Sequence, residues 1–125
     1  MRILLVEDED ALRELGVCIL TESGYTVLVA RNGREGVEVA TKNGDRIDLI
    51  VTDVIMPVLG GKDMINEIQP ILPQVPVMFM SGYTDDALAE HGVLEPGIFF
   101  IEKPFSPARL TYKVREILDA AGASG

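Results

Sequence analysis

Short apolar runs alternate with longer amphipathic stretches along this chain, and this alternation restricts its fold more than any other feature. Five of the apolar runs have the length of a strand: Ile3–Val6, Thr26–Ala30, Leu49–Thr52, Val75–Met80 and Ile98–Ile101. Parallel strands need crossover connections, which are usually helices, so this order of elements predicts a parallel sheet. Each run is almost continuously apolar, as expected for strands buried on both faces. The sequence therefore predicts a doubly wound α/β fold.

Residues that favour helix ends mark the first and last helices. The first is expected from about Ala11 to Ser23, between Asp10 as N-cap and Gly24 as terminator. Its buried side is expected to carry Leu12, Leu15, Cys18 and Ile19. The last helix has Ser106 as N-cap and Pro107 in its first position. Its apolar face is expected to hold Leu110, Val114, Ile117 and Ala121.

The three helices between these two have weaker signals. The second is predicted over residues 33–44, where the segment Asn32–Glu35 resembles a capping box. A third begins near Lys62 and must end or bend at Pro70. A short fourth helix is expected around residues 85–91.

Length and composition favour one domain. A chain of 125 residues with 47% hydrophobic content is long enough to bury a single core without disulfides. We expect this domain over residues 1–120, followed by a flexible tail of small residues at 121–125.

Charge and cysteine content bear on partners and location. The net charge of −9 repels both phosphodiester backbones and anionic lipids, so direct nucleic-acid or membrane binding is not expected. The single cysteine cannot form an internal disulfide, and no secretory segment precedes the first apolar run. These features predict a cytoplasmic protein.

Polar side chains follow four of the five predicted strands. The acidic segment Glu7–Asp10 follows the first, Asp53 the third, Ser81 the fourth and Lys103 the fifth. Ligands of open parallel sheets bind outside the carboxyl ends of the strands, so we expect these groups to converge at one edge. Such a set of carboxylates, a hydroxyl and an ammonium group predicts a binding site there.

Grouped carboxylates repel one another unless a cation neutralises them, and Mg²⁺ is a natural solution. Mg²⁺ prefers oxygen ligands, and Asp8, Asp53 and a backbone carbonyl just after Asp53 can supply them. A carboxylate beside Mg²⁺ can attack phosphorus and form an aspartyl phosphate. Asp53 is the best candidate for this nucleophile, because it ends a central strand and precedes an exposed turn.

The same residues resemble the receiver domain of bacterial response regulators over about residues 2–120. The resemblance depends on five features in order: Glu7-Asp8, Asp53 with Met56-Pro57 and Gly61, Ser81-Gly82, Phe100, and Lys103-Pro104-Phe105. Residues 81–116 look most like receivers at the C-terminus of hybrid sensor histidine kinases. The resemblance implies a flavodoxin-like (βα)5 fold with strand order 2-1-3-4-5 and five helices.

The resemblance also implies a role for each site residue. Asp53 is the expected phosphoacceptor, and the expected Mg²⁺ ligands are Asp8, Asp53, the main-chain carbonyl of Ile55 and, through a water, Glu7. Lys103 and Ser81 are expected to bind the phosphoryl group, and Ser81 and Phe100 to form a switch. The implied partner is a histidine kinase or a phosphotransfer domain, and the resemblance to hybrid kinases allows a kinase upstream in the same parent chain.

Two other functions are compatible with part of this pattern. A phosphatase of the haloacid dehalogenase type also uses a strand-end aspartate and Mg²⁺. That class usually needs a second acidic residue two positions after the nucleophile, where this chain has Ile55. A pseudo-receiver that acts by protein contact alone does not need the full set of polar site residues. The sequence therefore favours a non-enzymatic signalling domain that is phosphorylated.

Overall fold

The computed structural model describes residues 1–54, 56–81, 98–103 and 105–123, without the side chains of residues 45, 81 and 121–123. Strands and helices alternate through this part of the chain. Their order is β1 (Arg2–Val6), α1 (Asp10–Glu22), β2 (Thr26–Ala30), α2 (Gly33–Asn43), the short 3₁₀ helix η1 (Gly44–Arg46), β3 (Leu49–Asp53), α3 (Gly61–Ile68), β4 (Val77–Ser81), β5 (Ile98–Glu102) and α5 (Pro107–Ala123).

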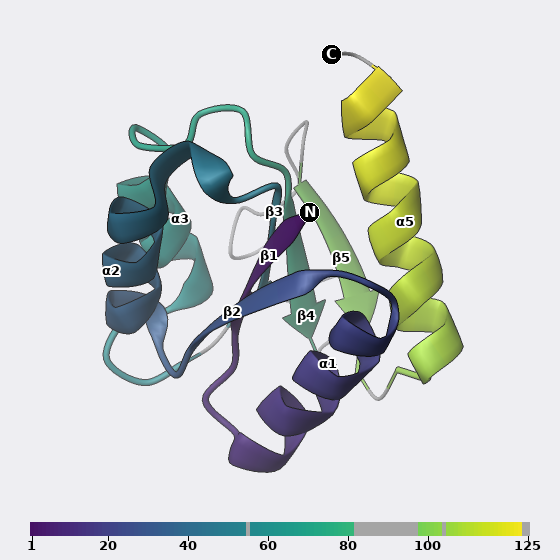
Figure 1. Ribbon diagram of the computed structural model, residues 1–125. Helices are drawn as coiled ribbons and strands as arrows, with labels where there is room; N and C mark the ends of the chain where they lie inside the picture. The colour runs from purple at the N-terminus through teal and green to yellow at the C-terminus, as the bar shows by residue number, and fades with distance from the viewer. Residues whose placement is uncertain (55, 82–97, 104, 124–125) are drawn as a thin grey trace.

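The strands form one parallel sheet in the order β2-β1-β3-β4-β5, as predicted. Helices α1 and α5 lie on one face of this sheet, and α2 and α3 lie on the other (Figure 1). All strands run in the same direction, so their carboxyl ends meet at the lower edge in the view of Figure 1. The predicted α/β class and strand order are therefore confirmed.

Alternate residues of the inner strands serve two separate cores. On the side of α2 and α3, Leu4 and Val6 of β1 pack with Phe79 of β4. On the side of α1 and α5, Ile3 and Leu5 of β1 pack with other strand and helix residues, including Ile19, Met78, Val114 and Ile117. Successive side chains of a strand point to opposite faces, so only a continuous apolar run fills both cores.

Side-chain caps fix the starts of two helices. The Asn32 side chain accepts a hydrogen bond from the Glu35 backbone N–H at 2.9 Å, and Ser106 Oγ accepts one from Arg109 N–H at 3.1 Å. Pro107 then occupies the first position of α5. These bonds satisfy N–H groups that have no partner within a helix. Both predicted N-caps are therefore confirmed.

The predicted orientation of α1 is wrong at two positions. Leu15 is 44% exposed and Cys18 is also exposed, whereas Gly16, Ile19 and Leu20 are buried. A Cβ atom built on Gly16 would lie only 2.8 Å from Leu5 Cδ2. The helix therefore approaches the sheet on the side of its glycine, while Leu15 and Cys18 face the surface.

The predicted N-cap of α1 is also wrong. Asp10 is the first residue of the helix, and Glu9 occupies the cap position without a side-chain cap bond. The Asp10 carboxylate instead forms an ion pair with Arg13 on the next turn. The other end of the helix follows the prediction, because Gly24 adopts a φ of +96° just after it.

Strand β4 begins two residues later than predicted. The N–H of Val75 donates to the carbonyl of Leu72 in a turn, and Pro76 has no N–H to donate. Helix α3 ends at Ile68, just before Pro70, as expected. Helix α5 continues to Ala123, three residues beyond the predicted end of the domain at residue 120. The predicted fourth helix lies outside the described residues.

No helix in the described part of the chain is both long and apolar enough to cross a membrane.

Candidate functional site

The candidate site forms where the carboxyl ends of the strands meet. Strand β1 ends at Val6 and leads directly to Glu7 and Asp8, and neighbouring β3 ends at Asp53. Lys103 follows the last residue of β5. Residues that are far apart in the sequence are therefore brought to one edge of the sheet, as the strand-end argument predicted.

Three carboxyl groups gather at this edge. Ligand oxygens of Glu7, Asp8 and Asp53 all lie within 4.8 Å of one another. Glu7 is 1% exposed and Asp53 is 5% exposed, whereas Asp8 lies at the surface. Two of the three acidic groups thus have little contact with water, and the third faces solvent.

Lys103 joins the two buried carboxyl groups. Its Nζ donates to Glu7 Oε1 at 2.8 Å and forms an ion pair with Asp53 Oδ1. The backbone N–H of Glu9 donates to the second oxygen of Glu7 at 3.1 Å. Charge-assisted hydrogen bonds of this kind offset the cost of removing carboxylates from water.

The two buried carboxyl groups, Glu7 and Asp53, differ in how readily they ionise. Burial and the neighbouring Glu7 raise the pKa of Asp53 to about 8, although Lys103 opposes the rise. Burial also raises the pKa of Glu7, but hydrogen bonds with Asp53, Lys103 and the Glu9 backbone outweigh it and bring it to about 2. Burial lowers the pKa of Lys103, but its bonds to the two carboxylates prevail and hold it above its usual value. Of the two buried carboxyl groups, Glu7 is therefore the more easily ionised and Asp53 the less easily ionised.

The connection from β3 to α3 is tightly packed beside Asp53. A Cβ atom built on Gly61 would lie 2.1 Å from the Asp53 carbonyl oxygen, so only glycine fits there. Gly33, at the start of α2, donates its N–H to the Leu59 carbonyl at 3.1 Å. Between these points, Leu59 N–H donates to the Pro57 carbonyl across Val58, which has a φ of +69°. Contacts with the first residues of α2 and α3 thus hold the backbone that follows Asp53 in place.

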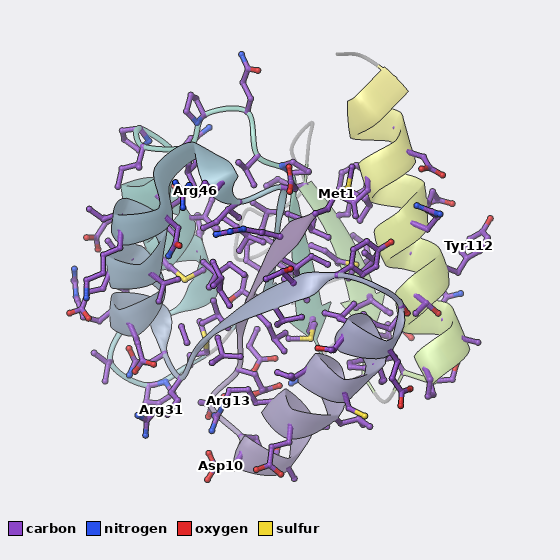
Figure 2. All side chains as sticks on the ribbon, viewed as in Figure 1. Met1, Asp10, Arg13, Arg31, Arg46 and Tyr112 are labelled. Atoms are coloured by element: carbon purple, nitrogen blue, oxygen red, sulfur yellow. The ribbon has the colours of Figure 1, made fainter. Side chains whose placement is uncertain are left out.

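The acidic turn after β1 is held by Arg13, which the sequence argument did not single out. The Arg13 Nη1 donates to the Glu7 carbonyl at 2.9 Å, and its Nη2 pairs with the Asp10 carboxylate. Figure 2 shows Asp10 and Arg13 at the edge toward which the strand arrows of Figure 1 point. An Asp and an Arg three residues apart on a helix could have suggested the ion pair, but not the bond to Glu7.

Three other predicted site residues have different outcomes. Ser81 ends β4 at the same edge, but its side chain lies outside the described residues. Ile55 is also outside the described residues, so the proposed role of its carbonyl stays a prediction. Phe100 lies opposite Phe79 in the pairing of β4 and β5, and it packs, partly buried, against the core on the side of α2 and α3.

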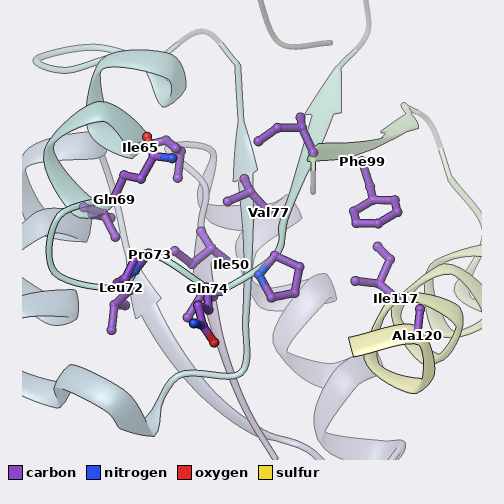
Figure 3. A pocket seen from close by; sticks show the side chains of 14 residues that line it. Ile50, Ile65, Gln69, Leu72, Pro73, Gln74, Val77, Phe99, Ile117 and Ala120 are labelled. Atoms are coloured by element: carbon purple, nitrogen blue, oxygen red, sulfur yellow. The ribbon is translucent and has the colours of Figure 1, made fainter. Parts of the chain in front are cut away.

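A cavity of about 340 Å³ lies elsewhere, around the amino end of β4. Figure 3 shows it between residues of α3, such as Ile65, and residues of α5, such as Ile117. Its wall is mostly apolar, with Gln69 and Gln74 as polar members. None of the grouped carboxyl side chains lines this cavity, so we place the functional site at the carboxyl edge instead.

The family model described as "Response regulator receiver domain" matches residues 3–115 of the chain. The chain belongs to the response regulator receiver domain family. Its receiver domain is 39% identical to sensor kinase CckA of Brucella abortus (strain 2308) over 94% of this chain and 12% of the kinase. It is 32% identical to the transcriptional regulatory protein GlrR of Escherichia coli (strain K12), over 94% of this chain and 26% of GlrR. The chain therefore spans a small part of each of these relatives.

Solved structures agree with this classification. The crystal structure of the receiver domain from hybrid histidine kinase CckA aligns with a TM-score of 0.83 and 38% identity, covering 94% of this chain and 99% of that one. A response regulator receiver domain protein from Clostridium thermocellum gives a TM-score of 0.88 at 27% identity, covering 99% and 98%. The chain is thus a two-component signalling module with similarity to the receivers of hybrid kinases.

The grouped oxygens of this receiver domain fit a hard divalent cation. Asp8 and Asp53 offer carboxylate oxygens, and Glu7 contributes a third acidic group within the same 4.8 Å. Mg²⁺ is commonly bound by one or two carboxylates, with waters and phosphate oxygens completing its shell. The donor set therefore has the chemistry that a magnesium site requires.

Proposed function

We propose that this receiver domain accepts a phosphoryl group on Asp53 from the phosphohistidine of a histidine kinase or phosphotransfer domain, in a Mg²⁺-dependent reaction. The observation that carries the proposal is the position of Asp53. It ends a central strand, lies beside Glu7 and Asp8, and is paired with Lys103.

In the proposed transfer, a carboxylate oxygen of Asp53 attacks phosphorus. An O–P bond forms while the P–N bond to the donor imidazole breaks, and the imidazole leaves with the electron pair of that bond. Asp53 must be ionised to act as nucleophile, so the surroundings that raise its pKa oppose the reaction unless a cation offsets them.

Cationic groups at the site have separate tasks. Bound Mg²⁺ would neutralise charge on the transferring phosphoryl oxygens. We assign its binding to Asp8 and Asp53, to the carbonyl of Ile55, and to Glu7 through a water. Lys103, already in contact with Asp53, would pair with the phosphoryl oxygens once they arrive.

A switch would follow from the new charge. The phosphoryl group brings strong acceptor oxygens, for which the Ser81 hydroxyl is a suitable donor. Movement of Ser81 would leave space that Phe100 can fill by turning inward. Because Phe100 has no hydroxyl, its inward state would depend on apolar contacts alone.

The similarity to sensor kinase CckA supports a place in a phosphorelay, including a kinase upstream in the same parent chain. The domain would catalyse only its own phosphorylation and dephosphorylation. Direct nucleic-acid or membrane binding is not part of this role, and a cytoplasmic location stays a prediction from the cysteine content.

Intact-mass spectrometry after incubation with acetyl phosphate and Mg²⁺ tests the proposal. We expect the protein to gain one phosphoryl group, about 80 Da, and Asp53→Asn to gain none, because the amide is not a competent nucleophile. Labelling of the Asn variant equal to that of the wild type would move the acceptor elsewhere. A wild type that takes no label from acetyl phosphate or a phosphorylated donor domain would favour a pseudo-receiver.

A further inference from the structure

We infer that Arg13 is a positioning residue that holds the acidic turn Glu7–Asp10 in the shape needed to present Asp8 to the cation. The inference builds on the magnesium site of the proposed function. It concerns a side chain that contacts neither the phosphoacceptor nor the grouped carboxylate oxygens in any described hydrogen bond or ion pair.

The Arg13 side chain bridges the two ends of this turn. Its Nη1 donates to the main-chain carbonyl of Glu7 at 2.9 Å, and its Nη2 pairs with the Asp10 carboxylate. Its backbone N–H donates to the Glu9 carbonyl at 2.9 Å. Asp8 lies between these anchors. With its side chain only 15% exposed, the arginine is held against the protein rather than extended into water.

The planar guanidinium suits this task because it directs several N–H donors in fixed directions. A lysine at the same position would keep the positive charge, but its three donors share one nitrogen at the end of a flexible stem. They lack the separate, fixed directions in which the two guanidinium nitrogens reach a backbone carbonyl and a carboxylate. Charge and geometry can therefore be separated by two substitutions at Arg13.

Electrostatics alone predicts the opposite result from positioning. Removing Arg13 leaves Asp10 without its partner and makes the turn more negative, which would favour cation binding. Asp10 is 81% exposed, so water screens its charge and this gain is small. Loss of the residues that orient metal ligands typically weakens metal binding roughly 10- to 100-fold. Positioning is therefore the larger effect.

The test is a Mg²⁺ titration followed through backbone amide NMR signals. We expect Arg13→Gln to raise the dissociation constant about tenfold, at the low end of the usual range because Asp8 faces solvent. Arg13→Lys should also weaken binding. Arg115→Gln, an exposed arginine on α5, changes the net charge by the same amount and should bind as the wild type does. Asp8→Asn removes a proposed ligand, so its dissociation constant shows how far binding weakens when that ligand is lost outright.

Saturating Mg²⁺ provides a second readout. The rate at which acetyl phosphate labels Asp53 should fall in Arg13→Gln at low Mg²⁺ and return to the wild-type rate at saturation, because only metal binding is impaired. Wild-type affinity or tighter binding in Arg13→Gln would overturn the inference and leave the proposed function intact. Full affinity in Arg13→Lys would show that charge alone suffices and would overturn it too. A wild type without any Mg²⁺ response would overturn both.

Discussion

Asp53 is an acidic side chain in a place where its ionised form is costly. It is 5% exposed and lies beside the ionised Glu7, so its pKa rises to about 8 although Lys103 is bonded to it. The same surroundings become suitable for an ionised aspartate once a divalent cation neutralises part of the negative charge. The repulsion between Glu7 and an ionised Asp53 is thus an electrostatic strain that a bound cation would relieve.

This strain predicts an unusual pH dependence of stability in the absence of metal. The pKa of Asp53 is raised from 3.8 to about 8, so its stabilising contribution is present below pH 4 and is lost as the pH rises toward 8. The amide of Asp53→Asn does not ionise, so the stability of the variant does not fall in this way as the pH rises. We expect the variant to exceed the wild type in unfolding free energy by about 1–3 kcal/mol at pH 8, and by less at pH 5.

Urea unfolding in the presence of a chelator measures this difference at both pH values. The exposed Asp119 of α5 offers a matched control, because Asp119→Asn removes the same charge from a solvated position. Glu7 titrates in the opposite sense, since its pKa is lowered to about 2: its contribution to stability is present above about pH 4.5 and is lost only as the pH falls below that value. The same gain for Asp53→Asn at pH 5 and pH 8 would contradict a raised pKa.

The sequence predicted the location of a site residue correctly where the path of the backbone alone determines that location. Glu7, Asp8, Asp53 and Lys103 follow strand ends, so the parallel order of strands is enough to bring them together. Which of Glu7 and Asp53 ionises more readily depends on their burial, and the sequence does not show how deeply each is buried. The bond from Arg13 to the Glu7 carbonyl depended on the path of the turn, for which no side-chain pattern gives a signal.

At the scale of elements, glycines decide how closely neighbouring segments approach. Gly16 lets α1 lie close against Leu5, and the buried face of the helix contains Gly16, Ile19 and Leu20 rather than Leu15. A stripe that included Leu15 was therefore a good guide to the presence of the helix and a poor guide to its rotation. Gly61 plays a similar part where α3 begins beside the Asp53 carbonyl.

The adjacent glycines at the start of α3 provide a sharp test of this role. We expect Gly61→Ala to lower the unfolding free energy by about 2 kcal/mol or more, because its Cβ would lie 2.1 Å from the Asp53 carbonyl oxygen. The shift of Asp53 should also slow its phosphorylation. Gly60→Ala meets its nearest atom, the Val54 carbonyl oxygen, at an ordinary 3.5 Å.

Chemical denaturation and acetyl phosphate labelling of the two variants provide the measurements. Gly60→Ala is expected to stay close to the wild type in stability and labelling rate. Equal losses in the two variants would mean that the loop is sensitive to any side chain, and that the contact between Gly61 and Asp53 is not special.

At the scale of the molecule, β4 ends at the candidate site and is paired with β5, the strand that carries Phe100. Phe100 of β5 lies beside Phe79 of β4, and Phe79 is buried in the core on the side of α2 and α3. In the proposed switch, a change at the end of β4 would reach Phe100 through these paired strands. Such coupling requires two arrangements that differ in their contacts with the phosphoryl group.

Beryllofluoride with Mg²⁺, as a stand-in for the phosphoryl group, tests this route. We expect backbone amide NMR signals from Ser81 through Lys103 to shift. Ser81→Ala should reduce the shifts of β5 while phosphorylation at Asp53 stays possible, because the acceptor oxygen is unchanged. Shifts confined to residues beside Asp53, in wild type and variant alike, would indicate a domain that passes on phosphate without this switch.

The division of β1 between two cores has a consequence for how such a domain can change in length. Loss of one codon within the strand would exchange the sides of Ile3 and Leu5 with those of Leu4 and Val6, and so disturb both helical layers at once. Loss of one codon in a connection between a helix and the next strand leaves every inward-facing residue in place. Insertions and deletions during the descent of this domain should therefore accumulate in those connections, while the strands keep their length.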